Sequence, residues 1–244
     1  MKILISNDDG IFAPGIAALV KAFSEARHEV IVCAPDSQCS AASQALSISR
    51  PVTVKEVDFP GAAKAYAIGG TPADCVKLGL MVLCPEVEAV VSGVNKGYNV
   101  GTDILYSGTV GAAMEGAIGG RPALAISQSE KREDFSKAAE LAVQMFEKLT
   151  AHPLRPLSVL NVNYPQTDEI KGIVTAKMEQ LHYEELYRPV ECDGMKAYAL
   201  SGFVRTDIAQ SDDYTKLCEG YATVSVLHYD MTDYDAANFW NTLV

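Results

Sequence analysis

The chain opens with the sequence KILISNDDGIFAPGIAALVKAFSEARHEVIVCA, residues 2–34, in which two apolar runs flank a helical pattern. The run at 2–6 predicts a buried strand, and the segment near 14–26, with Pro14 close to its start, predicts a helix. The second run, at 28–34, predicts another strand. A strand, a helix and a second strand in this order are typical of a parallel sheet covered by helices.

This alternation continues to residue 127 and weakens after residue 150, where mainly short extended pieces follow. We therefore predict a single α/β domain over residues 1–244, with a parallel sheet covered on both faces over about 1–150 and a β-rich elaboration over about 151–244. The other predicted elements are strands at 51–57, 87–92, 123–127, 157–162 and 222–228, a helix capped by Thr71 that runs from Pro72 to about Cys84, and helices at 108–119 and 133–149.

Composition limits the classes of function. The net charge of −11 over 244 residues argues against a polymeric nucleic-acid partner, because such partners are bound by clustered basic side chains. The N-terminal apolar run is too short for a signal peptide or a membrane span, so we expect a cytoplasmic protein with no membrane contact. The six cysteines form no Cys-x-x-Cys pair and the four histidines are scattered. Any bound metal should therefore be a hard ion held by oxygen rather than zinc.

Two adjacent carboxylates, Asp8 and Asp9, follow the first predicted strand. Like charges repel each other, so folding alone gives no reason for this pair. Three polar segments, 7–10, 36–43 and 92–101, follow predicted strands, and right-handed crossovers place such loops at one edge of a parallel sheet, where ligands bind. Their carboxylates, hydroxyls and side-chain amide suit Mg²⁺, Mn²⁺ or Ca²⁺. The alternative interpretation is a pair of solvated turn acids.

A second candidate feature is the predicted helix start at Ser107, Gly108 and Thr109. Free N–H groups and the helix dipole favour an anion there, and ordinary capping is the alternative. A metal site facing an anion-binding helix start is typical of a metal-assisted phosphate ester hydrolase. Other phosphate motifs fit less well, because segment 10–15 lacks the Lys-Ser/Thr of a P-loop and the glycine spacing of a dinucleotide fold. An aspartyl phosphatase would also have a second acid where Gly10 stands.

Several motifs occur in order along the chain, at 5–10, 34–41, 70–76, 92–97 and 106–110, with a weaker echo at 206–207 and 220–226. Together they resemble the SurE family of survival proteins, which are metal-dependent nucleotidases. The resemblance implies a Rossmann-like core and one divalent cation per subunit, Mg²⁺, Mn²⁺ or similar, held by Asp8, Asp9, Ser40 and Asn95. One departure is Cys39, which stands where the family usually has arginine.

The resemblance also implies hydrolysis of nucleoside monophosphates to nucleoside and phosphate, by in-line attack of water. We expect Asp8 and Asp9 to be catalytic as well as metal ligands, and a small nucleotide to be the substrate partner. The C-terminal extension is expected to exchange between subunits of a homodimer or homotetramer. A non-catalytic nucleotide-binding regulator is the alternative, and a metal-dependent glycosyltransferase fits less well because its Asp-x-Asp spacing is missing. The candidate substrate contacts are Asn99, Ser107, Gly108 and Thr109.

Overall fold

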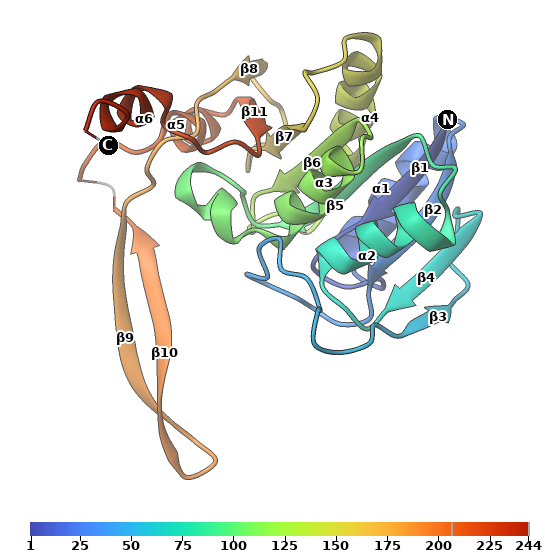
Figure 1. Ribbon diagram of the computed structural model, residues 1–244, viewed down its shortest axis with the longest axis horizontal. Helices are drawn as coiled ribbons and strands as arrows, with labels where there is room; N and C mark the ends of the chain where they lie inside the picture. The colour runs from blue at the N-terminus through green and yellow to red at the C-terminus, as the bar shows by residue number, and fades with distance from the viewer. Residues whose placement is uncertain (206, 244) are drawn as a thin grey trace.

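The computed structural model describes residues 1–205 and 207–243, so Thr206, part of the weaker C-terminal motif, lies outside the described residues. One nine-stranded sheet has the order β3-β4-β2-β1-β5-β6-β7-β11-β8 (Figure 1). The strands from β4 to β7 in this order run parallel, whereas β3 and β11 run antiparallel to β4 and β7. These strands are β1 (Lys2–Ser6), β2 (Glu29–Pro35), β3 (Val54–Glu56), β4 (Lys64–Ile68), β5 (Ala89–Lys96), β6 (Ala123–Gln128), β7 (Ser158–Tyr164), β8 (Ile173–Thr175) and β11 (Ala222–His228).

Helices cover both faces of this sheet, because its central strands are apolar on both sides. Successive side chains of a strand point to opposite faces, so Ile3 and Ile5 pack with α1 and α4, while Leu4 packs with α2. A third apolar cluster joins α3 to β6 and β7. The helices are α1 (Pro14–Glu25), α2 (Pro72–Leu78), α3 (Gly108–Ile118), α4 (Ser136–Ala151), α5 (Asp212–Cys218) and α6 (Tyr234–Trp240), with a π-helical turn η1 (Gly79–Leu83) and a 3₁₀ segment η2 (Gly101–Tyr106).

The strand order reverses at β1, which lies between β2 and β5. The chain passes from β1 to β2 on one side and later reaches β5 on the other. Such a reversal opens a crevice at the carboxyl ends of the two diverging strands, and ligands of open α/β sheets bind there. Ser6, the last residue of β1, is in register with Ser92 of β5, so the residues after Ser6 and those after Ser92 lie at the same edge of the sheet.

Strand β5 is longer than the sequence pattern predicted, since it continues to Lys96 instead of ending near Ser92. Gly93 permits this extension: its φ is 133°, and a Cβ atom there would lie 2.2 Å from the carbonyl oxygen of Ile126 in β6. The pairing of β5 with β6 shifts register between Ser92 and Asn95. The extension brings Asn95 to the edge of the sheet where β1 ends.

The C-terminal part departs most from the sequence prediction. Strands β9 (Tyr183–Cys192) and β10 (Met195–Val204) form a long antiparallel hairpin that projects away from the rest of the molecule (Figure 1). The expectation of mainly short extended pieces after residue 150 was wrong there, and it also missed α5 and α6. The short strand β4 was missed as well. The predicted class, a mostly parallel sheet between helices with a β-rich C-terminal extension, is confirmed.

Candidate active site

Asp8 and Asp9 lie in the turn that directly follows β1, at the mouth of the crevice. The turn is fixed by Asn7, whose Nδ2 donates to the carbonyl oxygen of Gly10 at 2.8 Å. Asp8 is 7% exposed and Asp9 is half-buried. Asp9 lines a cleft of about 400 Å³ that it shares with residues of the loop after β2. The turn therefore directs one acid into the protein and the other toward the cleft.

Asp8 is held by the first turn of α3. The hydroxyl of Thr109 donates to Asp8 Oδ1 at 2.5 Å, and the N–H of Thr109 donates to Oδ2 at 3.1 Å. Gly108 is required at this contact, because a Cβ atom there would lie 2.8 Å from the Cβ of Asp8. The N-terminus of α3 thus binds the carboxylate of Asp8, and the positive end of the helix dipole favours this negative charge.

The loop after β2 carries Ser40 to the same place. The N–H of Cys39 donates to the carbonyl oxygen of Asp8 at 2.7 Å, which fixes the backbone one residue before Ser40. Farther along, the hydroxyl of Ser43 donates to a carbonyl of η2, that of Leu105, at 2.6 Å. The loop is therefore attached on both sides of Ser40, whose side chain is exposed.

The start of α2 holds the end of this loop. Thr71 and Asp74 form the capping box that the sequence indicates, with each side chain bonded to the backbone of the other. The hydroxyl of Thr71 also donates to the carbonyl oxygen of Ala45 at 2.6 Å, and the Asp74 carboxylate accepts from the N–H of Ser47 at 3.0 Å. The motif at 70–76 therefore both begins a helix and anchors the loop that carries Ser40.

Strand β5 contributes Asn95 and Lys96. The N–H of Lys96 lies 3.4 Å from Asp9 Oδ2. Asn95 Nδ2 donates to the carbonyl oxygen of Gly97 at 2.8 Å, so its amide oxygen is the atom left for a ligand. The Lys96 ammonium pairs with Glu133 at 2.7 Å. Sequence reasoning included Lys96 in a motif but gave it no role, because its contact with Asp9 depends on the β1–β5 pairing.

The ionised forms of Asp8 and Asp9 are disfavoured by burial, and for Asp8 also by the charge of its neighbour. Burial raises the pKa of Asp8 to about 6, the hydrogen bond from Thr109 opposes this increase, and the negative charge of Asp9 adds to it. Burial also raises the pKa of Asp9, against the lowering effects of the N–H and the charge of Lys96. A cation beside both carboxylates would favour their ionised forms.

The donors at the crevice fit a hard divalent cation. The two carboxylates come from the turn after β1, the hydroxyl of Ser40 from the loop after β2 and the amide oxygen of Asn95 from the end of β5, and oxygen ligands of this kind suit Mg²⁺ or Mn²⁺. Over residues 1–205 and 207–243, no three His, Cys, Asp or Glu side chains gather into a metal-binding group. A cation held at Asp8 and Asp9 would therefore need neutral oxygen donors, such as those of Ser40 and Asn95, to complete its ligand set.

At the helix start predicted to contact substrate, most hydrogen-bonding groups already have partners within the protein. Ser107 caps α3 by accepting from the N–H of Val110 at 3.1 Å, and both donors of Thr109 point to Asp8. The N–H of Gly108 precedes these groups in the same turn. Phosphate contact at these residues stays a prediction, and the structure adds a function for Thr109 that the sequence pattern did not suggest.

Asn99, the remaining predicted substrate contact, is buried in a polar network. Its Nδ2 donates to the Ser127 hydroxyl at 2.7 Å. Its backbone carbonyl oxygen accepts from the side-chain amides of Asn161 and Asn163 at 2.9 and 3.0 Å. These contacts fix the loop between Asn95 and α3. Sequence reasoning missed Asn161 and Asn163, although two asparagines at i and i+2 in an otherwise apolar strand are a detectable signal.

Comparison with known proteins places the chain in a family. A family model described as "Survival protein SurE" matches residues 3–185. The chain belongs to the SurE family. It is similar to the "5'-nucleotidase SurE" of Clostridium beijerinckii, with 43% identity over 242 residues that cover 96% of this chain and 95% of the relative. The protein of the same name from Clostridium botulinum strain Eklund 17B is 42% identical over 246 residues, with 98% and 97% covered.

A solved SurE structure supports the same assignment. The crystal structure of the SurE protein from Aquifex aeolicus has a TM-score of 0.84 and 35% identity to this chain, and the match covers 100% of this chain and 99% of that one. The family predicted from the sequence motifs is therefore confirmed. Among the described residues, the helices of this SurE protein are all too short or too polar to cross a membrane.

Proposed function

We propose that this SurE protein is a 5'-nucleotidase, a phosphomonoesterase that hydrolyses nucleoside 5'-monophosphates to nucleoside and phosphate with one divalent cation per subunit. The observation that carries the proposal is the pair Asp8 and Asp9 at the β1–β5 crevice, with Asp8 bound by Thr109. Relatives named 5'-nucleotidase SurE match the chain over nearly its full length, which supports the same reaction.

The proposed ligands of the cation, Mg²⁺ or Mn²⁺, are Asp8, Asp9, Ser40 and Asn95. Two ionised carboxylates balance a charge of +2, and the neutral ligands add no further negative charge that would repel a phosphate group. When bound, such a cation supplies Lewis acidity that offsets the charge developing on the phosphoryl group. The hydrogen bonds from Thr109 keep the Asp8 carboxylate in one orientation for this purpose.

The two acids are proposed to have different functions in the reaction. Both oxygens of Asp8 accept hydrogen bonds from Thr109, so Asp8 suits a fixed ligand. Asp9 lines the cleft and suits the acceptor of a proton from the attacking water. The water oxygen forms a bond to phosphorus, the bond from phosphorus to the ribose oxygen breaks, and that oxygen takes the proton that Asp9 accepted from the water. Asn99, Ser107, Gly108 and Thr109 remain the proposed surroundings of the phosphate group.

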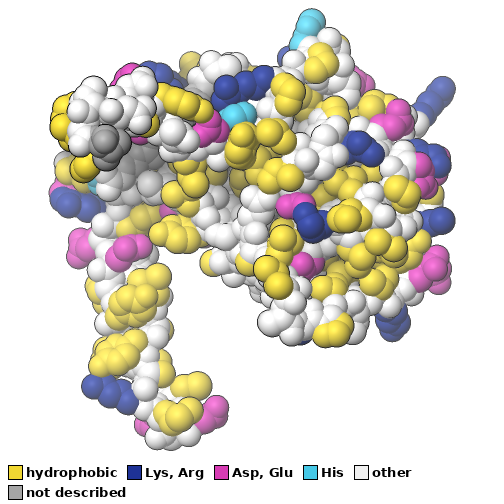
Figure 2. Space-filling model, in the orientation of Figure 1, with side chains coloured by type: hydrophobic (Ala, Val, Ile, Leu, Met, Phe, Trp, Pro, Cys, Tyr) yellow, Lys and Arg dark blue, Asp and Glu magenta, His cyan; other side chains and the backbone are white. Residues whose placement is uncertain are grey.

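The proposal includes a homodimer or homotetramer built through the C-terminal region. The β9–β10 hairpin exposes hydrophobic side chains along its length (Figure 2). A two-stranded hairpin on its own is marginally stable in water, so these side chains favour burial against a second copy of the chain. Helix α6 is a second exposed element of this region, because none of the residues Tyr234–Trp240 is buried.

A phosphate-release assay on a panel of nucleotides tests the proposed function. The panel contains the 5'- and 3'-monophosphates of adenosine, guanosine, cytidine and uridine, each with Mg²⁺, with Mn²⁺ and with excess EDTA. We expect hydrolysis that EDTA abolishes and either cation restores. Binding of nucleotides without phosphate release would show a non-catalytic regulator. Full turnover after exhaustive chelation, with no metal detected by elemental analysis, would refute the cation requirement.

A further inference from the structure

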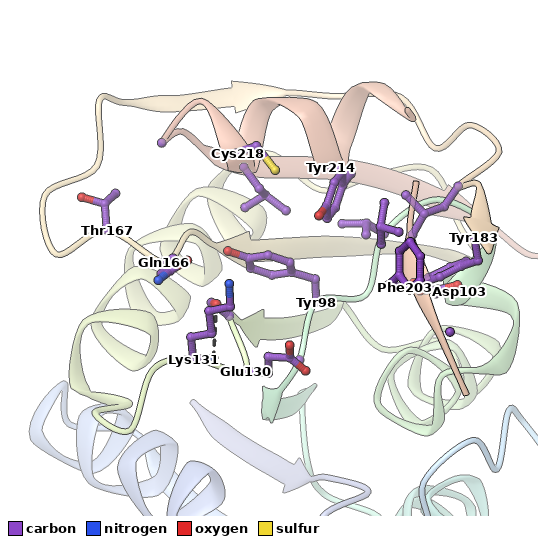
Figure 3. Close-up of a pocket in the computed structure, with 18 residues that line it drawn as sticks. Tyr98, Asp103, Glu130, Lys131, Gln166, Thr167, Tyr183, Phe203, Tyr214 and Cys218 are labelled. Carbon is purple, nitrogen blue, oxygen red and sulfur yellow. Dashed lines mark hydrogen bonds between the residues drawn. The ribbon is translucent and has the colours of Figure 1, made fainter. Parts of the chain in front are cut away.

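A cavity of about 900 Å³ lies between the segment after β5, the base of the β9–β10 hairpin and α5. Figure 3 shows its aromatic side chains: Tyr98 and Tyr214 come from two different walls, and Tyr183 and Phe203 lie together beside Asp103. Exposed polar residues, Glu130, Lys131 and Gln166, also line it. Aromatic side chains combined with polar groups in one cavity are typical of a small-molecule site.

The segment after Asn95 connects the candidate active site to the wall of the cavity. Gly97 lines the cavity, and its carbonyl oxygen accepts the hydrogen bond from Asn95, one of the proposed cation ligands. The next residue, Tyr98, places its ring in the cavity. Three residues of chain span at most about 11 Å, so the Tyr98 backbone lies within one nucleotide's length of Asn95. A ligand as long as a nucleotide is therefore long enough to span this distance.

The walls are held in place by two hydrogen bonds between distant segments. The hydroxyl of Tyr183 donates to the carboxylate of Asp103, which joins the start of β9 to η2. The N–H of Gly101 donates to Asp213 Oδ2 at 2.8 Å, which joins η2 to the start of α5. Tyr98, Tyr183 and Tyr214 pack around one small apolar cluster. The aromatic rings are thus positioned before any ligand arrives.

We propose that this cavity is the nucleobase subsite of the enzyme, with the base stacked on Tyr98 and Tyr214 while the phosphate lies at Asp8 and Asp9. The inference rests on the proposed nucleotidase function and adds to it the residues that select a nucleotide over other phosphomonoesters. Every base has a π-face, so stacking on tyrosine accepts both purines and pyrimidines. Gln166 and Lys131, at the exposed side, are placed to contact the polar edge of a base.

A second groove competes for this assignment. Its volume is about 1030 Å³, and it passes Ser107 at the start of α3. Its lining is mainly aliphatic, with Leu105, Val110, Met114 and Val226 among its members. Its two aromatic residues, His228 and Tyr229, are neighbours in the chain with ring centroids 4.7 Å apart. The first cavity carries Tyr98 and Tyr214 on two different walls, together with Tyr183 and Phe203, so it suits a stacked base better. The two are distinguished by substitutions on their separate walls.

The test compares hydrolysis of AMP with hydrolysis of ribose 5-phosphate, which has the same phosphate and sugar but no base. Tyr98→Leu and Tyr214→Leu keep apolar volume and remove the ring, whereas Tyr98→Phe keeps the ring. We expect the ratio of kcat/KM for AMP to that for ribose 5-phosphate to fall about tenfold in each leucine variant, because loss of one base–aromatic stack has an effect of this order. Tyr98→Phe and Leu105→Ala should keep the wild-type ratio. Circular dichroism and thermal melting establish that each variant is folded.

An unchanged ratio in both leucine variants, or a fall in Leu105→Ala instead, would overturn the proposed subsite. A wild-type enzyme that uses ribose 5-phosphate as well as AMP would overturn it too. Binding of adenosine by calorimetry separates this inference from the proposed function. If the protein hydrolyses no phosphomonoester, the nucleotidase assignment fails. Adenosine binding that weakens in Tyr98→Leu would still support the cavity, and equal or absent binding would refute it.

Discussion

The hydroxyl of Thr109 donates to Oδ1 of Asp8 at 2.5 Å, while the N–H of Thr109 donates to Oδ2 of the same carboxylate at 3.1 Å. The two residues are 101 positions apart in the chain. A carboxylate that ends the central strand is thus bound by the first turn of a helix on the neighbouring part of the sheet. This contact links the sheet, the helix dipole and the proposed cation site, and it leads to the first prediction.

Thr109→Val should lower both stability and turnover. The change removes the hydroxyl while keeping the side-chain volume, and a hydrogen bond to a charged group contributes about 1.5–3 kcal/mol. We expect a loss of unfolding free energy in this range by urea denaturation at pH 8, and a lower kcat/KM for AMP. Thr109→Ser, which keeps the hydroxyl, is the matched control and should stay close to wild type. Equal effects of valine and serine would contradict the proposed orientation of Asp8.

Asp8→Asn should abolish turnover without destabilising the metal-free protein. The substitution removes one of two repelling carboxylates but also one proposed ligand. The variant should therefore lose most of the increase in melting temperature that Mn²⁺ gives wild type, since an ion that binds only the folded state stabilises it by mass action. Melting curves with and without Mn²⁺, run beside the turnover assay, measure both effects. Asp58→Asn, at an exposed acid, is the control. A variant with normal activity and a normal Mn²⁺ response would show that the pair are ordinary turn acids.

The stability of the metal-free protein should depend on pH through Asp8. Its pKa is about 6 in the folded protein and 3.8 without burial. Because the folded pKa is the higher, its contribution to stability is fully present below 3.8 and is lost as pH rises through about 6. The loss amounts to about 3 kcal/mol. Urea unfolding in EDTA, carried out on wild type and Asp8→Asn at each pH, measures this loss. The unfolding free energy of wild type should fall relative to that of the variant as pH rises. A constant difference across this range would argue against the burial of an ionisable Asp8.

Tyr187→Ser combined with Leu200→Ser should weaken subunit assembly. These two exposed side chains lie directly opposite each other on the hairpin, in a register that pairs β9 with β10. We expect wild type to be a dimer or tetramer at micromolar concentration by light scattering, and the double variant to shift toward monomer. Glu191→Ser with Lys196→Ser, an opposite pair of polar residues in the same hairpin, is the matched control. A wild-type protein that is monomeric at this concentration would refute the assembly proposal.

The sequence predicted most of the features that depend on local pattern. The start of α2 was readable because Thr71, Pro72 and Asp74 each have a positional preference at a helix N-terminus. The strand at 222–228 was predicted with the bounds it has in the structure. Local pattern was also sufficient to place Asp8 and Asp9 at a strand end. In each of these cases, the residues that determine the local structure lie within about four positions of one another in the chain.

The missed features depend on neighbours far away in the chain. The sequence pattern suggested a helix cap or a phosphate contact at Thr109. Only the docking of α3 against β1 shows that Thr109 binds Asp8. The extension of β5 depends on the close passage of Gly93 by Ile126. The hairpin strands β9 and β10 are exposed on most of their surface, so no hydrophobic alternation marked their length. Pairing across the sheet, rather than propensity, determines these features.

The position of β1 in the sheet also has a consequence for synthesis of the protein. Residues 8 and 9 leave the ribosome early, but the N–H of Lys96 that faces Asp9 comes 87 positions later and Thr109 comes 101 positions after Asp8. In a nascent chain these two acids therefore contact only water until β5 has paired with β1 and α3 has docked. The site proposed for a cation is assembled only by that step, so uptake of the ion would mark the completion of the central sheet during folding.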